Sequence, residues 1–283
     1  MAWTIRSVLA WARGYLQTKG SPSPRLDAEL LLAHALAKDR MHLYLDLDRP
    51  LLEGELASYR NLLKRRAERE PVAYILGHRE FYSRDFAVNR DVLIPRPETE
   101  ILVEKAVELA PESGEVFEIG VGSGAVIVSI LLERPDLRGC GTDISEAAIT
   151  VARENARGHG VEDRLRLLAG DLFEGVSGKF PVIVANPPYV SFDDAPLLQE
   201  DVLRYEPGQA LFAGNDGLDI IRRIVAQASG HLEPGGRLIM EIGHGQRGAV
   251  EKMVGENGEL TLLQWIRDLA GSDRAVIAEN THG

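Results

Sequence analysis

Four consecutive residues, Asn186-Pro187-Pro188-Tyr189, combine groups that can hold a planar NH2 group. They follow an apolar run, residues 180–185, that is short enough to be a buried strand. The two prolines supply no backbone donor and have fixed φ angles, so the carbonyls of Asn186 and Pro187 are held in a stiff turn. The Asn186 side chain adds an amide oxygen, and Tyr189 adds a flat aromatic face. Such a turn suits an amide or an exocyclic amine, although a proline-rich turn that only closes a strand is the alternative.

A glycine-rich segment, Glu118-Ile119-Gly120-Val121-Gly122-Ser123-Gly124, lies between an expected strand and an expected helix. Glycines at such a junction let the backbone turn tightly and approach a ligand closely. The segment also fits a dinucleotide site, because Gly120, Gly122 and Ala125 satisfy that pattern. Asp143 ends the next expected strand, close to the ~20-residue offset at which an acidic residue binds ribose hydroxyls. A helix N-cap is the structural alternative for Asp143.

Three features distinguish a dinucleotide site from a site for a ligand that contains an amino acid. Glu118 precedes the glycines, where its carboxylate suits a cation such as the amino group of an amino acid and would repel a pyrophosphate. Asp171 and Leu172 follow the third expected strand and place an acid and an apolar side chain where an adenine ring can lie. The Asn-Pro-Pro-Tyr turn follows the fourth expected strand. A dehydrogenase does not need such a turn for its reaction.

The segment Pro95-Arg96-Pro97-Glu98-Thr99-Glu100 precedes another expected helix. Pro97 fits the first turn of that helix, and Glu98 and Glu100 favour its positive N-terminal end. Helix capping alone would explain these residues. The functional alternative is a segment that covers the site, with Arg96 and Glu98 facing substrate or cofactor.

Strand and helix patterns alternate from residue 115 onward. Strands are expected at residues 115–119, 139–142, 165–169, 182–185 and 237–242, and helices at 125–132, 146–157, 217–229 and 248–254. A long loop follows the Asn-Pro-Pro-Tyr turn, and two extended runs, 260–266 and 275–278, come last. The alternation predicts an α/β fold with a seven-stranded, mostly parallel sheet, helices on both faces and a terminal antiparallel hairpin.

Residues 4–76 have helical periodicity without a strand signal, which predicts a small helical bundle. The outer face of the third expected helix, residues 53–69, carries Arg60, Lys64, Arg65, Arg66 and Arg69. A solvated face is the usual meaning of such a run, and a docking patch is the alternative. Residues 81–94 combine apolar side chains with turn formers at 89–91, which predicts a β-hairpin bridging two domains.

The bulk composition excludes several classes of protein. A chain of 283 residues can form one large or two medium domains. Its formal net charge of -11 argues against general, salt-driven binding to nucleic acid. Cys140 is the single cysteine and no histidine has metal-ligand spacing, so we expect neither a disulfide framework nor a metal. We expect a cytoplasmic protein with no membrane partner, because the sequence has no signal peptide and no membrane span.

These motifs resemble a known family. Glu118-x-Gly120-x-Gly122-x-Gly124, Asp143, Asp171 and the Asn-Pro-Pro-Tyr turn look like those of class I S-adenosylmethionine-dependent methyltransferases that act on nitrogen. Further segments are similar to the release-factor glutamine N5-methyltransferases: residues 71–77 with 80–81, 95–100, 205–207 with 210–211, 214–219 and 241–246. The resemblance runs from about residue 70 to 250. Leu172 departs from it, because relatives often have an aromatic residue there.

The resemblance implies methyl transfer from S-adenosylmethionine to the glutamine amide in the Gly-Gly-Gln motif of class 1 peptide chain release factors. It implies a Rossmann-like class I methyltransferase domain at residues 96–283, a β-hairpin linker at 81–95 and a helical substrate-recognition domain at 1–80. The implied cofactor-binding residues are Glu118, Gly120, Val121, Gly122, Ser123, Gly124, Asp143, Asp171, Leu172 and Asn186. The implied catalytic residues are Asn186, Pro187, Pro188 and Tyr189, and Arg96 and Glu98 join them in binding substrate. We expect a monomer that forms no stable complex with nucleic acid.

Three rival functions remain open at the level of sequence. An adenine N6-methyltransferase acting on DNA would use the same turn, but it needs a base-flipping site and a basic channel. A noncatalytic module that senses S-adenosylmethionine would bind the cofactor without turnover. A nicotinamide oxidoreductase would bind NAD.

Overall fold

A computed structural model describes residues 3–281, so the outermost residues of the ranges 1–80 and 96–283 lie outside the description. The chain forms two compact units, Met1–His78 with Gln199–Tyr205, and Arg79–Leu198 with Glu206–Gly283. The short segment near residue 200 therefore belongs to the helical unit, although it lies far along the chain within the range expected for the methyltransferase domain. None of the helices in the described range has the length and apolar character needed to cross a membrane.

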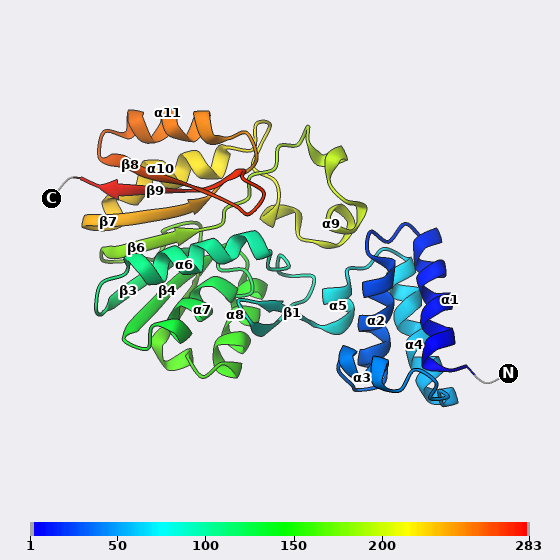
Figure 1. Ribbon diagram of the computed structural model, residues 1–283. Coiled ribbons are helices and arrows are strands. Elements are labelled where there is room, and N and C mark those ends of the chain that lie inside the picture. Colours follow the sequence, from blue (N-terminus) through cyan, green and yellow to red (C-terminus); the bar gives the residue numbers. More distant parts are fainter. Residues whose placement is uncertain (1–2, 282–283) are drawn as a thin grey trace. The chain divides into compact units, whose positions relative to one another are not determined.

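The first unit is a helical bundle around one apolar core, as the sequence predicts (Figure 1). Its helices are α1 (Ile5–Thr18), α2 (Pro24–Ala35), α3 (Arg40–Leu45), α4 (Glu53–Ala67), α5 (Val72–Leu76) and α9 (Glu200–Tyr205). In α1 the buried residues Ile5, Val8, Ala12 and Leu16 share one face because they recur at helical spacing. Thr4 caps the helix, since its hydroxyl accepts the backbone N–H of Ser7 at 3.3 Å.

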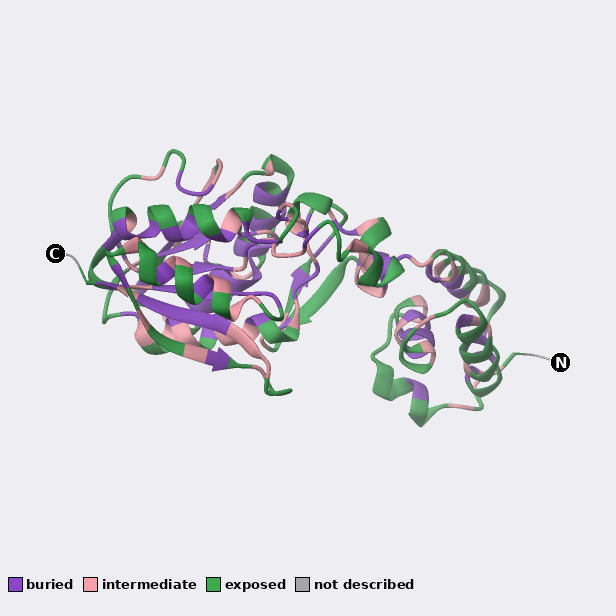
Figure 2. Cartoon of the chain, turned by 90° about the horizontal axis from the view of Figure 1, so that it is seen from above, coloured by how far each residue is buried: buried purple, intermediate pink, exposed green. Residues whose placement is uncertain are grey.

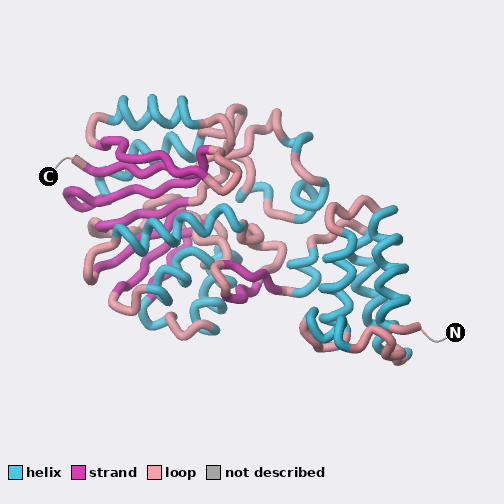
Figure 3. The backbone as a smooth tube through the Cα atoms, in the orientation of Figure 1, coloured by secondary structure: helices cyan, strands magenta, loops and turns pink. Residues whose placement is uncertain are grey.

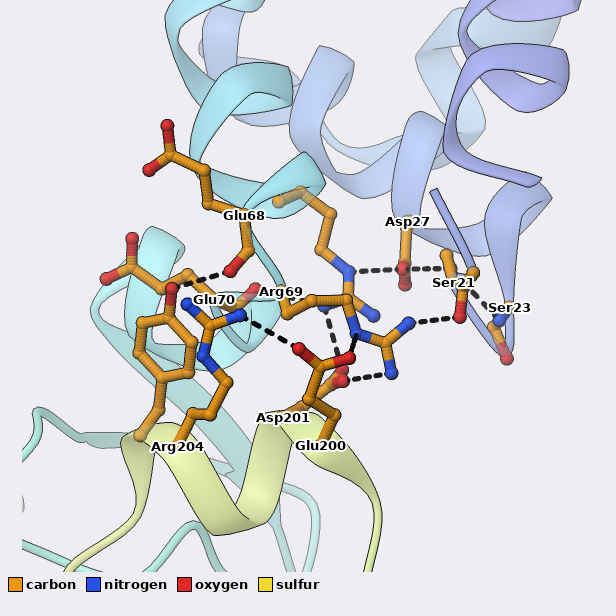
Figure 4. A network of polar contacts seen from close by, with 12 residues as sticks. Ser21, Ser23, Asp27, Glu68, Arg69, Glu70, Glu200, Asp201 and Arg204 are labelled. Carbon is orange, nitrogen blue, oxygen red and sulfur yellow. Dashed lines mark hydrogen bonds and ion pairs between the residues drawn. The ribbon is translucent and has the colours of Figure 1, made fainter. Parts of the chain in front are cut away.

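Ion pairs fasten α9 to the rest of the helical unit (Figure 4). Arg66 is 4% exposed and pairs with Asp27 at 2.7 Å and with Asp201 at 2.8 Å. Arg69 pairs with Asp201 at 2.5 Å and with Glu200 at 3.5 Å. These contacts join residues far apart in sequence, which explains why the segment groups with the bundle.

The basic run on α4 is not the fully solvated face that we expected. Arg60 and Lys64 are exposed, but Arg66 is buried and Arg65 and Arg69 are partly buried. The expectation is wrong for Arg66 because acidic side chains from two other helices neutralise its charge inside the unit.

The hairpin between the two regions differs from its expected position. Its strands are β1 (His78–Phe81) and β2 (Arg84–Ala87), so the turn formers at residues 89–91 follow the hairpin. The turn itself is made by Tyr82 and Ser83, which have φ values of 51° and 58°. This two-residue turn lacks the glycine or asparagine that usually marks one, so the sequence carried no local signal for it.

The second unit contains a seven-stranded sheet in the order β5-β4-β3-β6-β7-β9-β8 (Figure 3). The strands are β3 (Gly114–Ile119), β4 (Leu137–Asp143), β5 (Leu165–Ala169), β6 (Phe180–Ala185), β7 (Leu232–Glu241), β8 (Leu260–Arg267) and β9 (Asp273–Asn280). The first five are parallel, and β9 pairs antiparallel with both β7 and β8. The expected fold class is confirmed.

Helices cover both faces of this sheet, whose central strands are largely buried (Figure 2). The principal helices are α6 (Glu100–Leu109), α7 (Ala125–Glu133), α8 (Glu146–Gly158), α10 (Asp219–His231) and α11 (Arg247–Asn257), and the short 3-10 turns are η1 (Pro97–Thr99), η2 (Glu162–Arg164), η3 (Ala195–Leu197) and η4 (Gly208–Ala210). Neighbouring strand residues face opposite sides, since Val116 and Val182 join the core with α6 and α7, whereas Phe117 and Ile183 join the core with α10 and α11.

Candidate active site

A cavity of about 360 Å³ lies at the carboxyl ends of the parallel strands in the second unit. Its walls include residues that end or follow β3, β4, β5 and β6. From β3 the chain proceeds outward through β4 to β5, whereas β6 and β7 lie on the other side of β3. The crevice between β3 and β6 is therefore the topological switch point, where open α/β sheets bind their ligands.

The loop after β3 is shaped by three glycines with positive φ, Gly120 at 72°, Gly122 at 53° and Gly124 at 78°. Side chains with a Cβ rarely adopt this conformation, so glycine is favoured at each position. The loop is tied to β4 because Gly120 and Val121 donate their backbone N–H groups to the carbonyl of Thr142, at 2.8 and 3.0 Å. A Cβ on Gly120 would meet no atom within 4 Å, so a ligand can approach the backbone there.

Glu118, near the end of β3, lines the cavity and is only 3% exposed. Its Oε2 accepts the backbone N–H of Ile127, in the first turn of α7, at 3.0 Å. Burial raises the pKa of the Glu118 carboxyl well above its usual value, and the nearby charge of Asp143 raises it further. A cationic group in the cavity would favour the charged carboxylate, so this residue fits the amino group of an amino acid.

Asp143 ends β4, and its carboxylate holds two loops. One oxygen accepts the backbone N–H of Gly122 and the other that of Ser145, both at 2.9 Å. Burial raises the pKa of this carboxyl, while the two backbone hydrogen bonds oppose the rise. Each oxygen has a second lone pair, so the carboxylate can still accept hydroxyl donors from the cavity.

The loop after β5 contributes Asp171 and Leu172 to the cavity wall. Asp171 pairs with Arg223 of α10 at 2.7 Å, and Arg223 also lines the cavity. Leu172 is 7% exposed and has a φ of 52°, with its carbonyl accepting the hydroxyl of Thr142 at 2.5 Å. The loop thus presents an apolar side chain beside an ion pair, which suits a heterocycle with polar edges.

The Asn-Pro-Pro-Tyr turn places Asn186, Pro187 and Pro188 on the cavity wall directly after β6. Asn186 donates its side-chain Nδ2 to the hydroxyl of Thr99 at 3.1 Å. The residues expected to bind an NH2 group therefore follow β6, and the glycine loop follows the neighbouring strand β3.

Tyr189 does not line this cavity. Its ring packs against the core on the α10 side, and its hydroxyl donates to Glu241 at 3.3 Å. Burial, aided by the charge of Glu241, raises the pKa of Tyr189 to about 12. The backbone carbonyl of Tyr189 accepts the side-chain amide of Gln246 at 3.0 Å, so this residue anchors the turn. Stacking of its ring on a substrate stays a prediction.

Arg96 and Glu98, in the segment before α6, lie in different environments. Arg96 lines the cavity and pairs with the buried Glu206 at 2.6 Å, and Glu206 also accepts the backbone N–H of Ile94 at 3.2 Å. Glu98 is exposed and does not line the cavity. Only Arg96 of this pair is therefore placed to face a ligand within the cavity.

The structure gathers most of the candidate residues around one cavity. Those on its wall are Arg96, Glu118, Gly120, Val121, Ser123, Asp143, Asp171, Leu172, Asn186, Pro187 and Pro188. Gly122, Gly124, Glu98 and Tyr189 are not on it. Sequence reasoning missed Phe81, Thr99, Phe212 and Arg223, which also line the cavity. Thr99 and Phe81 lie inside segments that resemble the family, at residues 95–100 and 80–81, whereas Phe212 and Arg223 carried no motif signal. Across residues 3–281, no three acidic, histidine or cysteine side chains gather as a metal site would require.

The sheet, the glycine loop and the acidic end of β4 define a Rossmann-like methyltransferase domain. The family model described as "Methyltransferase small domain" matches residues 97–202, and the one described as "PrmC N-terminal domain" matches residues 7–77. A solved methyltransferase from Pyrococcus furiosus has a similar fold, with a TM-score of 0.53 and 18% identity over 79% of this chain and 99% of that one.

Two curated relatives narrow the class. A release factor glutamine methyltransferase of Geobacter sulfurreducens is 46% identical, covering 97% of this chain and 96% of the relative. One of Rhodopirellula baltica is 39% identical, covering 96% of this chain and 95% of the relative. The chain belongs to the release factor glutamine methyltransferase family, and it is a methyltransferase that uses S-adenosylmethionine. The family resemblance seen in the sequence is thereby confirmed.

Proposed function

We propose that this chain transfers a methyl group from S-adenosylmethionine to N5, the side-chain amide nitrogen, of the glutamine in the Gly-Gly-Gln motif of class 1 peptide chain release factors. The observation that carries this proposal is the position of the Asn-Pro-Pro-Tyr turn beside the switch-point cavity, with Asn186 and Pro187 on its wall. The names of the two relatives support the substrate, since both are release factor glutamine methyltransferases.

The residues after β3, β4 and β5 fit the parts of the cofactor. Glu118 and the glycine loop would hold the methionine end, Asp143 the ribose hydroxyls, and Asp171 with Leu172 the adenine. Burial raises the pKa of both Glu118 and Asp143, and a bound cationic amino group or hydroxyl donors would favour their charged forms. Bound S-adenosylmethionine supplies a methyl group made electrophilic by its positive sulfur.

The turn would compensate for the weak nucleophilicity of an amide. The lone pair of an amide nitrogen is delocalised into its carbonyl. Asn186 Oδ1 and the Pro187 carbonyl would each accept one N–H of the glutamine and turn the out-of-plane lone pair toward the methyl group. Both oxygens also stabilise the positive charge that develops on nitrogen. The related loss of one oxyanion-hole donor costs about 2.7–4 kcal/mol in other enzymes. A strong base is not required, because the proton becomes acidic once the methyl group has moved.

Neighbouring side chains would position the substrate. Arg96, held by Glu206, would face the incoming chain, and Glu98 would contact it from the exposed surface. The ring of Tyr189 would stack on the amide plane after a change of side-chain orientation, since it now packs against the core.

The proposal also assigns a role to each part of the chain. Residues 1–80 would recognise the release factor, 81–95 would link the units and 96–283 would carry out methyl transfer. The protein would act in the cytoplasm as a monomer, without a stable complex with nucleic acid. The net charge of -11 supports the last point, because it opposes general, salt-driven binding to nucleic acid.

The test is incubation of the chain with labelled S-adenosylmethionine and a purified release factor, followed by mass mapping of the label. We expect one methyl group on the glutamine of the Gly-Gly-Gln motif and none on a release factor in which that glutamine is replaced by alanine. Label on DNA adenine instead would support the rival methyltransferase. Cofactor binding without label on either substrate would support the sensing module.

A further inference from the structure

Thr99 bridges the buried Glu241 and the partly buried Asn186 beside the cavity. It ends η1, is 4% exposed and donates its hydroxyl to Oε2 of Glu241 at 2.7 Å. The same hydroxyl oxygen accepts Nδ2 of Asn186 at 3.1 Å. Glu241, at the end of β7, is 1% exposed and is not on the cavity wall. The three side chains thus form a line from the core to the turn.

The direction of each hydrogen bond follows from the number of protons. A hydroxyl has one proton, and an ionised carboxylate can only accept. Thr99 must therefore give its proton to Glu241, which leaves its oxygen lone pairs to accept from Asn186. Asn186 can donate to this oxygen only through Nδ2. Its Oδ1 therefore points away from Thr99 and stays available as an acceptor. Within residues 3–281, no other side chain or backbone group donates a hydrogen bond to Oδ1.

The second oxygen of the same carboxylate holds the other end of the turn. Oε1 of Glu241 accepts the hydroxyl of Tyr189 at 3.3 Å. Gln246, from the same motif as Glu241, donates to the Tyr189 carbonyl at 3.0 Å. One buried carboxylate therefore contacts both Tyr189 and, through Thr99, Asn186.

We propose that Glu241 and Thr99 are positioning residues for methyl transfer, which orient the Asn186 amide so that its oxygen is offered to the substrate. The inference deepens the proposed function and rests on it for the identity of the substrate. With the opposite orientation, Asn186 would present two N–H donors to a substrate NH2 group, and neither group could accept from the other.

The charge state required of Glu241 is available at the pH of a methyltransferase assay. Burial raises the pKa of Glu241 to about 7, while the bonds from Thr99 and Tyr189 and the charge of Arg274 favour the carboxylate and the charge of Glu98 opposes it. The carboxylate therefore predominates at pH 8, and both measurements are made at that pH.

The first measurement needs no substrate. Asparagine-selective ¹⁵N labelling would display the side-chain NH2 of Asn186, assigned by its loss in Asn186→Asp. We expect one proton of this group to exchange at least about tenfold more slowly in the wild type than in Thr99→Val, because the bond to Thr99 protects it. Equal exchange in the two proteins would overturn the proposed orientation.

The second measurement is kinetic. Thr99→Val keeps the shape of threonine and removes its hydroxyl, so we expect kcat to fall about 10- to 100-fold through misorientation of Asn186. KM for the release factor and Kd for S-adenosylmethionine should stay within about threefold, since Thr99 is only 4% exposed and its hydroxyl is engaged by Glu241 and Asn186. Thr99→Ser, which keeps the hydroxyl, should restore most of kcat. Thr99→Ala gives the same comparison if valine prevents folding.

Thr150→Val is the matched control. Thr150 is exposed on α8 and its hydroxyl contacts only the backbone carbonyl of Glu146, at 3.0 Å, so kcat should be unchanged. A Thr99→Val enzyme with wild-type kcat would overturn the positioning role, as would equal losses in Thr99→Val and Thr99→Ser. If the wild type shows protected Asn186 but methylates no release factor, the proposed function fails while the orientation of Asn186 stands.

Discussion

Replacing Gly217 with alanine would displace the Asn-Pro-Pro-Tyr turn without altering any of its side chains. Gly217 has a φ of 72°, and its carbonyl accepts the side chain of Gln246 at 3.1 Å. A Cβ at this position would lie 2.3 Å from the backbone oxygen of Tyr189 and 3.1 Å from the backbone nitrogen of Ser191. The side-chain Nε2 of Gln246, at 3.0 Å, can move aside, but the tightest neighbour is a backbone atom and cannot do so without moving the turn.

The size of the effect follows from this overlap. Real Cβ contacts are essentially never under 3.0 Å, so the Tyr189 oxygen and the new methyl group must separate by at least 0.7 Å (3.0 - 2.3). A misplacement of about 1 Å can cost about 100-fold in rate, so we expect kcat to fall roughly 10- to 100-fold. The positive φ adds about 1–2 kcal/mol of backbone strain. Overpacking adds about 1–3 kcal/mol more to the loss of folding stability.

Gly245→Ala is the control for this prediction. Gly245 directly precedes Gln246 and has a φ of 80°, but a Cβ there would meet nothing within 4 Å. Both variants carry the strain of a positive φ, and only Gly217→Ala carries the overlap. The assay is kcat at saturating substrate, with cofactor Kd by calorimetry and unfolding by urea. Equal kcat for the two variants would refute the idea that close packing at Gly217 sets the position of the turn.

Four further predictions test separate parts of the molecule. Asn186→Ala should lower kcat at least about 100-fold while cofactor Kd stays within about threefold by calorimetry, and near-normal turnover would contradict its role. Asp143→Ala should weaken cofactor binding about 10- to 100-fold, because hydrogen bonds to a charged acceptor are lost, and an unchanged Kd would exclude that contact. Arg66→Ala should lower the free energy of unfolding of the helical unit by about 3–5 kcal/mol by leaving buried carboxylates unpaired, whereas the exposed Lys64→Ala should change it by less than about 0.5 kcal/mol, and equal urea midpoints would contradict this. Since the pKa of Glu241 rises from 4.5 to about 7 on folding, the wild type should lose stability as pH rises through that window. Glu241→Gln should therefore gain about 2–4 kcal/mol relative to the wild type between pH 4.5 and 7, and a constant difference would show that Glu241 is not so perturbed.

Local patterns were enough to predict the parallel sheet and the glycine loop. Apolar strands alternate with amphipathic helices, and both signals depend on residues close together in sequence. The position of the Asn-Pro-Pro-Tyr turn followed from its place after β6, because carboxyl ends of parallel strands meet at one edge. The residues after β3, β4 and β6 therefore gathered as expected.

Features that depend on distant partners were not predictable in this way. The burial of Arg66 requires Asp27 and Asp201, which are far away in sequence. The bridge through Thr99 joins η1, β7 and the turn, so neither its existence nor its direction can be derived from spacing along the chain. Motifs that contain such residues were visible, but their roles became clear only from the hydrogen bonds.

A crystal structure of the chain with S-adenosylhomocysteine and a Gly-Gly-Gln peptide would test the central claim most directly. The account predicts that Asn186 Oδ1 and the Pro187 carbonyl each lie about 2.7–3.2 Å from the glutamine side-chain nitrogen, with that nitrogen facing the cofactor sulfur. A glutamine whose carbonyl oxygen faces the turn, or whose nitrogen contacts neither acceptor, would contradict it.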